Sequence, residues 1–312
     1  MANIKGIKMR KLIILLCALL WSGLALAGYD EAVVAYKKGD FKTAAKEFQK
    51  LAEQGNADAQ NFLGMMYQSG KGVSQDYAQA IKWYRNAADQ GYASAQYLLG
   101  MMYVKGQGVA QNDAQAVKWF SKAAEQGNPT AQYSIGIMYE LGRGVLQDYK
   151  QAAEWFRRAA AQGNANAQLE LGVMYDKGQG IPQDYKLAME WYRKAAEQGD
   201  ADAQNNLGAM YRQGQGVPQD YKQAVAWFRR AAEHGNANAQ FGLGAMYVRG
   251  DGVAQDYVRA YQWLNLAATS GDNVAIHLRD LIAAKMTNSQ IEEAQRLARD
   301  WAVKHTKPTS PE

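Results

Sequence analysis

Cysteine is almost absent from this sequence of 312 residues. The only cysteine, Cys17, lies in an apolar segment near the N-terminus. A chain that loses this segment has no thiol, which excludes disulfides, thiolate zinc sites and a cysteine nucleophile. Histidine is scarce too, because His234, His277 and His305 are far apart and share no ligand spacing. The sequence therefore predicts no catalytic site, no cofactor and no metal site.

Long apolar runs are also missing, except for Leu12–Trp21 ("LIILLCALLW"). Ala25-Leu26-Ala27 follows this run, and the basic residues before it are Lys5, Lys8, Arg10 and Lys11. A basic region, an apolar region of about ten residues and an A-x-A site form the pattern of a secretory signal peptide. An uncleaved anchor is the alternative, but the run is shorter than the ~20 residues of a spanning helix. We predict cleavage after Ala27 and no integral membrane segment thereafter.

The excess of positive charge lies in this same segment. The whole chain has a formal net charge of +5, and residues 1–27 contain four basic side chains and no acidic ones. Without them, 31 basic side chains face 30 acidic ones, which leaves a net charge of +1. This balance predicts no nucleic-acid partner. An exported chain without cysteine is compatible with the bacterial periplasm, and secretion from the cell is the alternative.

A glycine-rich octapeptide recurs six times at an interval of 36 residues. One copy, "GQGIPQDY", resembles a phosphate loop, but such a loop follows a strand and this one follows a helical pattern. A fixed period in the 20–50 range instead predicts a solenoid of stacked units. The copies begin at Gly70, Gly106, Gly142, Gly178, Gly214 and Gly250.

Each repeat is predicted to form two helices, as residues 164–199 illustrate. Asn164 can cap the first helix, in which apolar side chains such as Leu171 recur at helical spacing. Gly178 is expected to end that helix in the left-handed conformation, and Asp184 to cap the second helix. Recurrence makes such aspartates caps rather than catalytic carboxylates. Because neither helix can bury its apolar face alone, the predicted fold class is an all-α solenoid of antiparallel helix pairs.

Two further positions recur in all six repeats and are predicted to be structural. A glycine within the first helix costs about 1 kcal/mol relative to alanine, so its recurrence indicates close approach of the two helices. A periodic tryptophan in the second helix indicates inter-helix core rather than a ligand box. The glycines are Gly64, Gly100, Gly136, Gly172, Gly208 and Gly244, and the tryptophans are Trp83, Trp119, Trp155, Trp191, Trp227 and Trp263.

The repeat pattern fades at both ends, which predicts capping elements. Residues 28–55 keep the second-helix pattern after a shorter turn at Gly39-Asp40. A final helix follows a capping box at either Thr287…Gln290 or Ser289…Glu292. The predicted organisation is a signal peptide (1–27), an N-terminal capping helix pair (28–55), six repeats (56–271), C-terminal capping helices (272–304) and a disordered tail (305–312).

The pattern A-x-A-Q-x-x-L-G-x-M-Y-x-x-G-x-G-V-x-Q-D-Y-x-x-A-x-x-W-[YF]-x-x-A-A-x-x-G is similar to the Sel-1-like repeat, a relative of the tetratricopeptide repeat. It covers residues 56–271. The resemblance implies a right-handed superhelix that binds other proteins and assembles complexes. Such a repeat indicates a scaffold and does not imply a particular reaction. Cysteine-rich members are described as penicillin-binding or β-lactamase-like, but their regular cysteine pairs are missing here.

In tetratricopeptide-like folds the first helix of each pair lines the concave groove, and two positions of that helix vary between the repeats. Mixed aromatic, acidic, amide and basic residues are typical of a groove that selects a ligand, although drift on a solvated face is the alternative. The residues three places before the helix glycine are Asn61, Tyr97, Tyr133, Leu169, Asn205 and Phe241. Those four places after it are Gln68, Val104, Glu140, Asp176, Arg212 and Val248.

Arginines recur on the second helices and could form an anionic docking strip. Acidic residues four places later predict helical ion pairs and a largely neutralised face instead. The pairs are Arg85 with Asp89, Arg193 with Glu197 and Arg229 with Glu233, while Arg157 faces an alanine.

These features predict an exported, non-enzymatic scaffold that binds a protein or peptide in the bacterial cell envelope. We expect a monomer or a weak oligomer. The alternative function is a cell-wall or β-lactam hydrolase, suggested only by the cysteine-rich relatives. A third interpretation is an architectural protein whose repeats serve self-assembly.

Overall fold

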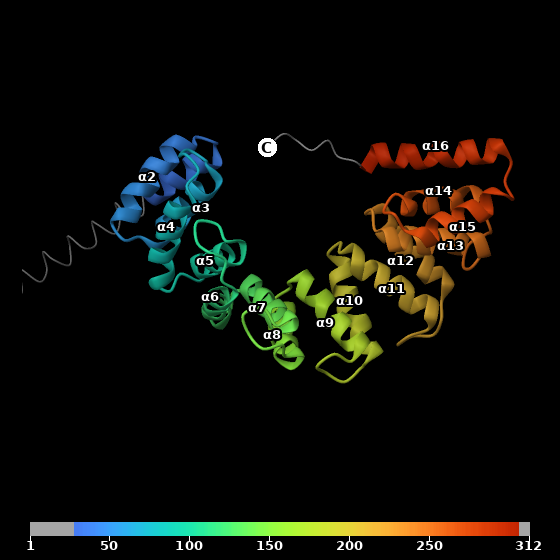
Figure 1. Cartoon of the computed structure of the whole chain (residues 1–312), viewed down its shortest axis with the longest axis horizontal. Coiled ribbons are helices and arrows are strands. Elements are labelled where there is room, and N and C mark those ends of the chain that lie inside the picture. The colour runs from blue at the N-terminus through green and yellow to red at the C-terminus, as the bar shows by residue number, and fades with distance from the viewer. Residues whose placement is uncertain (1–27, 306–312) are drawn as a thin grey trace, which may run out of the picture. The chain divides into compact units, whose positions relative to one another are not determined.

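The computed structural model describes residues 28–305, and every regular element in that range is a helix (Figure 1). This confirms the predicted all-α fold class. The predicted signal peptide, residues 1–27, and residues 306–312 of the predicted tail lie outside the described residues. The described helices group into two compact units, one ending at Gln147 and the other beginning at Asp148.

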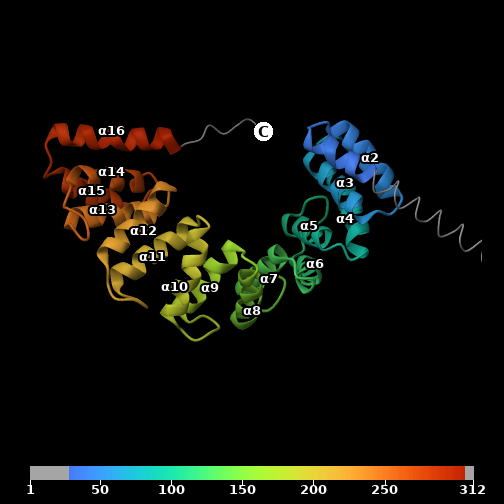
Figure 2. The same cartoon turned by 180° about the vertical axis from the view of Figure 1, so that it is seen from behind.

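Within each unit the helices succeed one another in chain order and pack on their neighbours (Figure 2). The first unit contains a helix over residues 28–37, α2 (Phe41–Glu53), α3 (Ala57–Ser69), α4 (Tyr77–Asp89), α5 (Ala93–Lys105), α6 (Asp113–Glu125) and α7 (Pro129–Leu141). The second unit contains α8 (Tyr149–Ala161), α9 (Ala165–Lys177), α10 (Tyr185–Glu197), α11 (Ala201–Gln213), α12 (Tyr221–Glu233), α13 (Ala237–Arg249), α14 (Tyr257–Ala268), α15 (Asn273–Ala283) and α16 (Asn288–His305).

Side-chain caps set the helix boundaries as predicted. The first helix of a repeat (helix A) follows a residue such as Asn164, whose Oδ1 accepts a backbone N–H at 2.9 Å. The second helix (helix B) follows a residue such as Asp184, which accepts two backbone N–H groups. Asn112 caps α6 at the place where the other repeats have an aspartate. Tyr92 makes no side-chain cap, and its hydroxyl interacts with Asp58 of the preceding repeat.

The glycine within helix A lies against a large side chain of helix B in the same repeat. A Cβ on Gly172 would lie 2.6 Å from the ring of Tyr192, and one on Gly208 would lie 2.7 Å from Phe228. Glycine therefore permits an approach that alanine would prevent. The ring belongs to the residue after the tryptophan. Gly64, Gly100 and Gly244 meet Tyr84, Phe120 and Leu264 in the same way.

The glycine-rich loop joins helices A and B of one repeat and packs on the preceding repeat. Its first glycine ends helix A in the left-handed conformation, as Gly178 does with a φ of 67°. Its second glycine, such as Gly180, also has positive φ, and a Cβ there would lie 2.4 Å from the carbonyl carbon of Tyr149. Tyr149 is the first residue of the preceding helix B, α8. The loop therefore packs backbone to backbone on the repeat before it.

A buried glutamine also joins consecutive repeats. Gln168 donates its Nε2 to the carbonyl of Ala160 at 3.1 Å and accepts from Gln198 at 2.8 Å. Burial of this amide is tolerated because its carbonyl and amino groups are both paired. The equivalent glutamines are Gln60, Gln96, Gln132, Gln204 and Gln240, and all are at most 5% exposed.

The tryptophans differ in exposure. Trp83, Trp119 and Trp263 are buried, and Trp83 packs in the core of the preceding helices with Leu63 and Met66. Trp155, Trp191 and Trp227 are half-buried. Basic side chains cover the exposed rings, for example Lys194, whose Nζ lies 3.9 Å from the Trp191 ring centroid. The stripe therefore combines inter-helix packing with cation–π contacts.

Both ends of the described chain carry additional helices. Tyr29, in the helix over residues 28–37, packs edge-on against Phe48 of α2. At the other end, Thr287 and Gln290 form the capping box, since each side chain accepts a hydrogen bond from the other's backbone N–H. Helix α16 packs on α14 and continues to His305, which stacks on Trp301. The prediction that the disordered tail begins at residue 305 is therefore wrong for His305.

Candidate interaction surface

The residues predicted to line a groove lie on the exposed side of helix A, with one exception. Asn61 is only 5% exposed, and its Nδ2 contacts the sulfur of Met65. The expectation that it lines an open groove is wrong, because packing covers it. The half-buried positions are Tyr97, Tyr133, Leu169, Asn205 and Phe241 in one row and Gln68, Val104, Glu140, Asp176, Arg212 and Val248 in the other.

The second of these rows is coupled to the buried ring of helix B. The Tyr84 hydroxyl donates to Gln68 at 2.7 Å, and Tyr192 donates to Asp176 at 3.4 Å. Where helix B instead carries Phe228, the guanidinium of Arg212 lies 5.7 Å from its ring centroid. The side chain at this position therefore varies with the buried ring of helix B in the same repeat. Internal packing thus accounts for part of the variation that the sequence analysis attributed to ligand selection.

Electrostatics reinforce this coupling at Tyr192. Burial raises the pKa of the Tyr192 hydroxyl, and the neighbouring Asp176 carboxylate raises it further. The phenol therefore stays protonated and serves as a hydrogen-bond donor to Asp176. The same burial raises the pKa of Tyr84 beside Gln68.

The first row links consecutive repeats. The Tyr97 ring lies 5.7 Å from Phe120 of its own repeat, and its hydroxyl interacts with Ser134 of the next. Burial raises the pKa of Tyr97 despite this hydrogen bond. Tyr97 therefore stabilises the stack as well as contributing to its surface.

A third row, between these two, was missed by sequence reasoning. It consists of the residue directly after each helix A glycine, and we call it the central row. Its members are apolar in all six repeats, and five are half-buried. Because these positions are apolar in every repeat, the sequence does not distinguish them from core residues. Only their partial exposure in the structure does so. The central row is Met65, Met101, Ile137, Val173 and Ala209, followed by the buried Ala245.

The helix B arginines donate to tyrosines of the next repeat instead of forming the predicted ion pairs. Arg193 donates to the Tyr211 hydroxyl at 3.0 Å, and Arg85 donates to Tyr103 at 2.9 Å. Arg229 contacts Tyr247 in the same way. The long guanidinium side chain reaches across the repeat boundary, which a pattern within one helix does not reveal.

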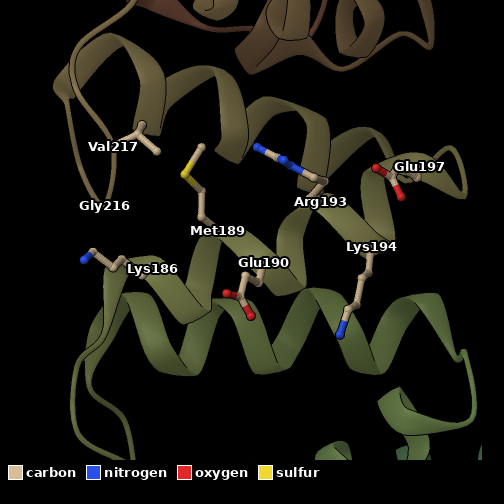
Figure 3. A pocket seen from close by; sticks show the side chains of 8 residues that line it. All are labelled: Lys186, Met189, Glu190, Arg193, Lys194, Glu197, Gly216 and Val217. Atoms are coloured by element: carbon tan, nitrogen blue, oxygen red, sulfur yellow. The ribbon is translucent and has the colours of Figure 1, made fainter.

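A depression of about 540 Å³ lies between α10 and the loop after α11 (Figure 3). Met189 and Arg193 point to one side of α10, and Glu190 and Lys194 point to the other (Figure 3). Arg193 already bonds Tyr211, and Lys194 covers Trp191. A second depression occurs at the equivalent residues of α2 and the loop after α3. These hollows therefore belong to the repeat boundary, with mixed charge at their rims.

The possible metal ligands in the described part of the chain are scattered. Within residues 28–305, no cluster of three His, Cys, Asp or Glu side chains is placed to hold a metal ion. The Nδ1 of His234 lies 3.2 Å from Gln204 Oε1, where other repeats use a glutamine donor. No helix over this range has the length and apolarity needed to cross a membrane.

The family described as Sel1 repeat matches six consecutive windows, residues 57–92, 93–128, 129–164, 165–200, 201–236 and 237–272. This chain belongs to the Sel1 repeat family. The resemblance inferred from the sequence is thus confirmed, and so is the solenoid class of the fold. Sel1 repeat proteins are generally scaffolds for protein interactions.

Solved structures include similar chains. A Sel1 repeat protein from Oxalobacter formigenes shares 35% identity over 77% of this chain and 96% of its own, with a TM-score of 0.69. The protein c5321, a protective antigen of uropathogenic Escherichia coli with an SLR fold, shares 31% identity over 94% of this chain and 81% of its own, with a TM-score of 0.41. Among curated proteins, none matches the chain.

Proposed function

We propose that this Sel1 repeat protein is an exported, non-enzymatic scaffold that binds a protein partner of the bacterial cell envelope through its helix A faces. The observation that carries the proposal is the central row, an apolar position of helix A that the fold leaves half-buried in five of the six repeats. Apolar anchors among polar neighbours are typical of protein interfaces. The signal-peptide pattern of residues 1–27 supports export.

Site-specific photocrosslinking tests the scaffold role. A photoreactive amino acid is placed at Met101 or Ala209 on helix A, and at the exposed Lys82 or Glu190 on helix B as matched controls. We expect the helix A positions alone to yield a defined protein adduct in the native host. Adducts from helix B alone, or none from either helix, would contradict the proposed face.

Export and chemistry need separate measurements. The N-terminus of the purified native protein should be Gly28, and the protein should fractionate with the periplasm. Recovery in the cytoplasm with residues 1–27 intact would exclude export. The purified protein is also tested for turnover of a chromogenic β-lactam. Turnover, together with its loss on a point mutation, would reject the scaffold function in favour of the hydrolase alternative.

A further inference from the structure

Basic side chains gather on three successive helices B of the second unit, α8, α10 and α12. Each of these helices has a basic residue at its second, ninth and tenth positions, and all nine side chains are exposed. On α10, Arg193 and Lys194 diverge from the helix, which spreads the charge across its width (Figure 3). We call the nine residues the basic strip: Lys150, Arg157, Arg158, Lys186, Arg193, Lys194, Lys222, Arg229 and Arg230.

Ion pairs do not neutralise the basic strip. None of its nine side chains forms one within residues 28–305. The ninth-position arginine of each helix donates instead to a tyrosine of the next repeat, as Arg193 does to the Tyr211 hydroxyl at 3.0 Å. The neutral phenol orients the guanidinium and leaves its charge and its other N–H donors available.

Acidic residues reduce the charge of these helices without cancelling it. The three helices contain four exposed glutamates, Glu154, Glu190, Glu197 and Glu233. Four negative charges against the nine positive ones leave a net charge of +5. The surface therefore favours an anionic occupant.

The fold does not require basic residues at these three positions. In the first unit, α6 begins with Ala114 at the second position and carries Ser121 at the ninth, and α4 carries Asn86 at the tenth. The next helix B of the second unit, α14, has no basic residue at any of the three positions. Repeats therefore stack without these charges, which points to a role of the basic strip outside the fold.

Partly exposed tryptophans accompany the charge on the same three helices. Trp155, Trp191 and Trp227 are half-buried, whereas Trp83 and Trp119 of the first unit are buried. The tenth-position cation lies 3.9 to 4.6 Å from the centroid of each half-buried ring. Tryptophan is enriched where proteins meet the headgroup region of a bilayer, because its ring is apolar and its N–H is polar.

Charge and tryptophan together favour a lipid surface over an acidic protein segment. Anionic headgroups attract lysine and arginine, whose long side chains let the charged ends reach the phosphates above a partly apolar layer. Basic residues combined with tryptophan are the composition of helices that lie on membranes. An acidic protein segment would account for the charges alone.

We propose that the basic strip binds the surface of a membrane that contains anionic phospholipids. Its arginines and lysines donate to the headgroup phosphates, and the three tryptophans lie at the boundary of the headgroup layer. The contact uses helices B, so it goes beyond the scaffold function proposed for the helix A faces and does not depend on it. Salt reverses such binding, which makes it compatible with recovery of the protein in the periplasmic fraction.

Vesicle sedimentation with the purified native protein tests the proposal. The vesicles consist of phosphatidylcholine, either pure or mixed with about 30% phosphatidylglycerol. We expect at least tenfold tighter binding to the anionic vesicles at low salt, and loss of that binding in about 0.5 M NaCl. Equal binding to both kinds of vesicle, or binding to neither, would overturn the proposal.

Substitution of the ninth-position arginines locates the contact. Arg157→Gln with Arg193→Gln and Arg229→Gln removes three charges from the basic strip and should weaken binding to the anionic vesicles at least tenfold. Unchanged binding in this variant would overturn the proposal.

The matched control removes the same charge from helices B of the first unit. Lys42→Gln with Arg85→Gln and Lys122→Gln replaces one basic residue at each of the same three positions and should weaken binding less than threefold. Both variants keep the N-terminus of the parent, so any contribution of residues 1–27 cancels. Equal losses in the two variants would show that total charge decides binding, which would overturn the assignment to the basic strip.

Lysine labelling of the parent protein avoids any folding defect of the variants. Anionic vesicles should slow the acetylation of Lys186 and Lys222 and leave that of Lys42 and Lys82 unchanged, as read by mass spectrometry. Equal protection of all four lysines, or protection of none, would count against the basic strip.

An acidic protein segment is the competing occupant. Binding of a polyglutamate peptide that requires the three arginines, without binding of anionic vesicles, would overturn the proposal in favour of a protein partner. Failure of the vesicle experiments leaves the scaffold function standing, because that function is tested by protein adducts from helix A.

Discussion

At the scale of single residues, the ring of Phe228 lies between two helical glycines. A Cβ on Gly208 of its own repeat would lie 2.7 Å from the ring, and a Cβ on Gly242 of the next repeat would lie 3.2 Å from it. The same ring thus tolerates a methyl group on one side better than on the other.

The two glycines make a matched pair of substitutions. Gly208→Ala should lower the free energy of unfolding by about 1–3 kcal/mol, because overpacking outweighs the gain of ~1 kcal/mol in helix propensity. Gly242→Ala should stay within about 0.5 kcal/mol of the parent, since the ~1 kcal/mol gain in helix propensity offsets the cost of a small shift of the ring. Urea unfolding measures both, and equal losses would show that the ring contact does not decide the outcome.

Tyr192 predicts a change in alkaline stability. Because burial and Asp176 raise its pKa in the folded chain, the unfolded chain loses the phenol proton first, and stability falls as the pH rises above about 10. Tyr192→Phe should cost about 0.5–1.5 kcal/mol at pH 7 through the lost hydrogen bond. Above pH 10 the substitution should reduce the rate at which the free energy of unfolding falls with pH, by up to ~1.4 kcal/mol per pH unit. Identical slopes in parent and variant would contradict this account.

Residue roles were predictable where recurrence had a local cause. Gly178 and Asp184 follow from helix-end chemistry, so the sequence suffices for them. The sequence did not show which residue lies against Gly172, because Trp191 and Tyr192 are adjacent aromatic residues that differ only in the side of the helix on which they lie. Asn61 was misplaced for a related reason: its burial depends on packing that the repeat pattern does not encode.

At the scale of elements, the loop between helices A and B is held by its second glycine. Gly180→Ala should reduce the free energy of unfolding by more than about 3 kcal/mol, because it adds a backbone clash to the left-handed strain. Gly199 also has positive φ, but a Cβ there meets nothing within 4 Å. Gly199→Ala should therefore cost only about 1–2 kcal/mol. Thermal and urea unfolding distinguish the two, and similar losses would mean that the close approach to Tyr149 is unimportant.

A second element-level pair crosses one repeat boundary. Asp113 replaces the tyrosine with which helix B begins in the other repeats. Two guanidinium nitrogens of Arg143, in the next loop, donate to the two carboxylate oxygens of Asp113 at 2.9 and 3.0 Å. A double-mutant cycle with Asp113→Asn and Arg143→Gln should give a coupling of about 0.5–1 kcal/mol that weakens in high salt. A coupling of zero at low salt would make the contact incidental.

The candidate surface was only partly predictable from these elements. The sequence placed variable residues on helix A, but it could not show that Gln68 and Asp176 face buried tyrosines of helix B. The central row was missed because Met65 and Met101 resemble core residues in the repeat pattern. The arginine contacts were missed because Arg193 and Tyr211 are far apart in the chain and on different helices.

At the scale of the whole molecule, equivalent contacts recur between repeats of the second unit. Gln204 bonds the carbonyl of Ala196, and Gln240 bonds that of Ala232 in the same way. After removal of one repeat, Gln240 would stand where Gln204 stood. The stability of such arrays is approximately a sum of repeat and interface terms.

Deletion of residues 201–236, one family window, should therefore give a folded protein with unchanged helicity per residue and a lower unfolding midpoint. Deletion of residues 201–234 is the matched control, since it shifts every later contact by two residues. Circular dichroism and urea unfolding compare them. A register-preserving deletion that fails to fold would show that the repeats are not interchangeable.

The packing of each loop on the preceding helix B has a consequence for synthesis. Gly180 contacts Tyr149, and Gln68 bonds Gln107 across 39 residues. Every such contact connects a new repeat to one already made. A chain delivered from its N-terminus can therefore dock each helix pair as it emerges, without waiting for distant segments. A pause during translation would leave at most about one repeat unpaired.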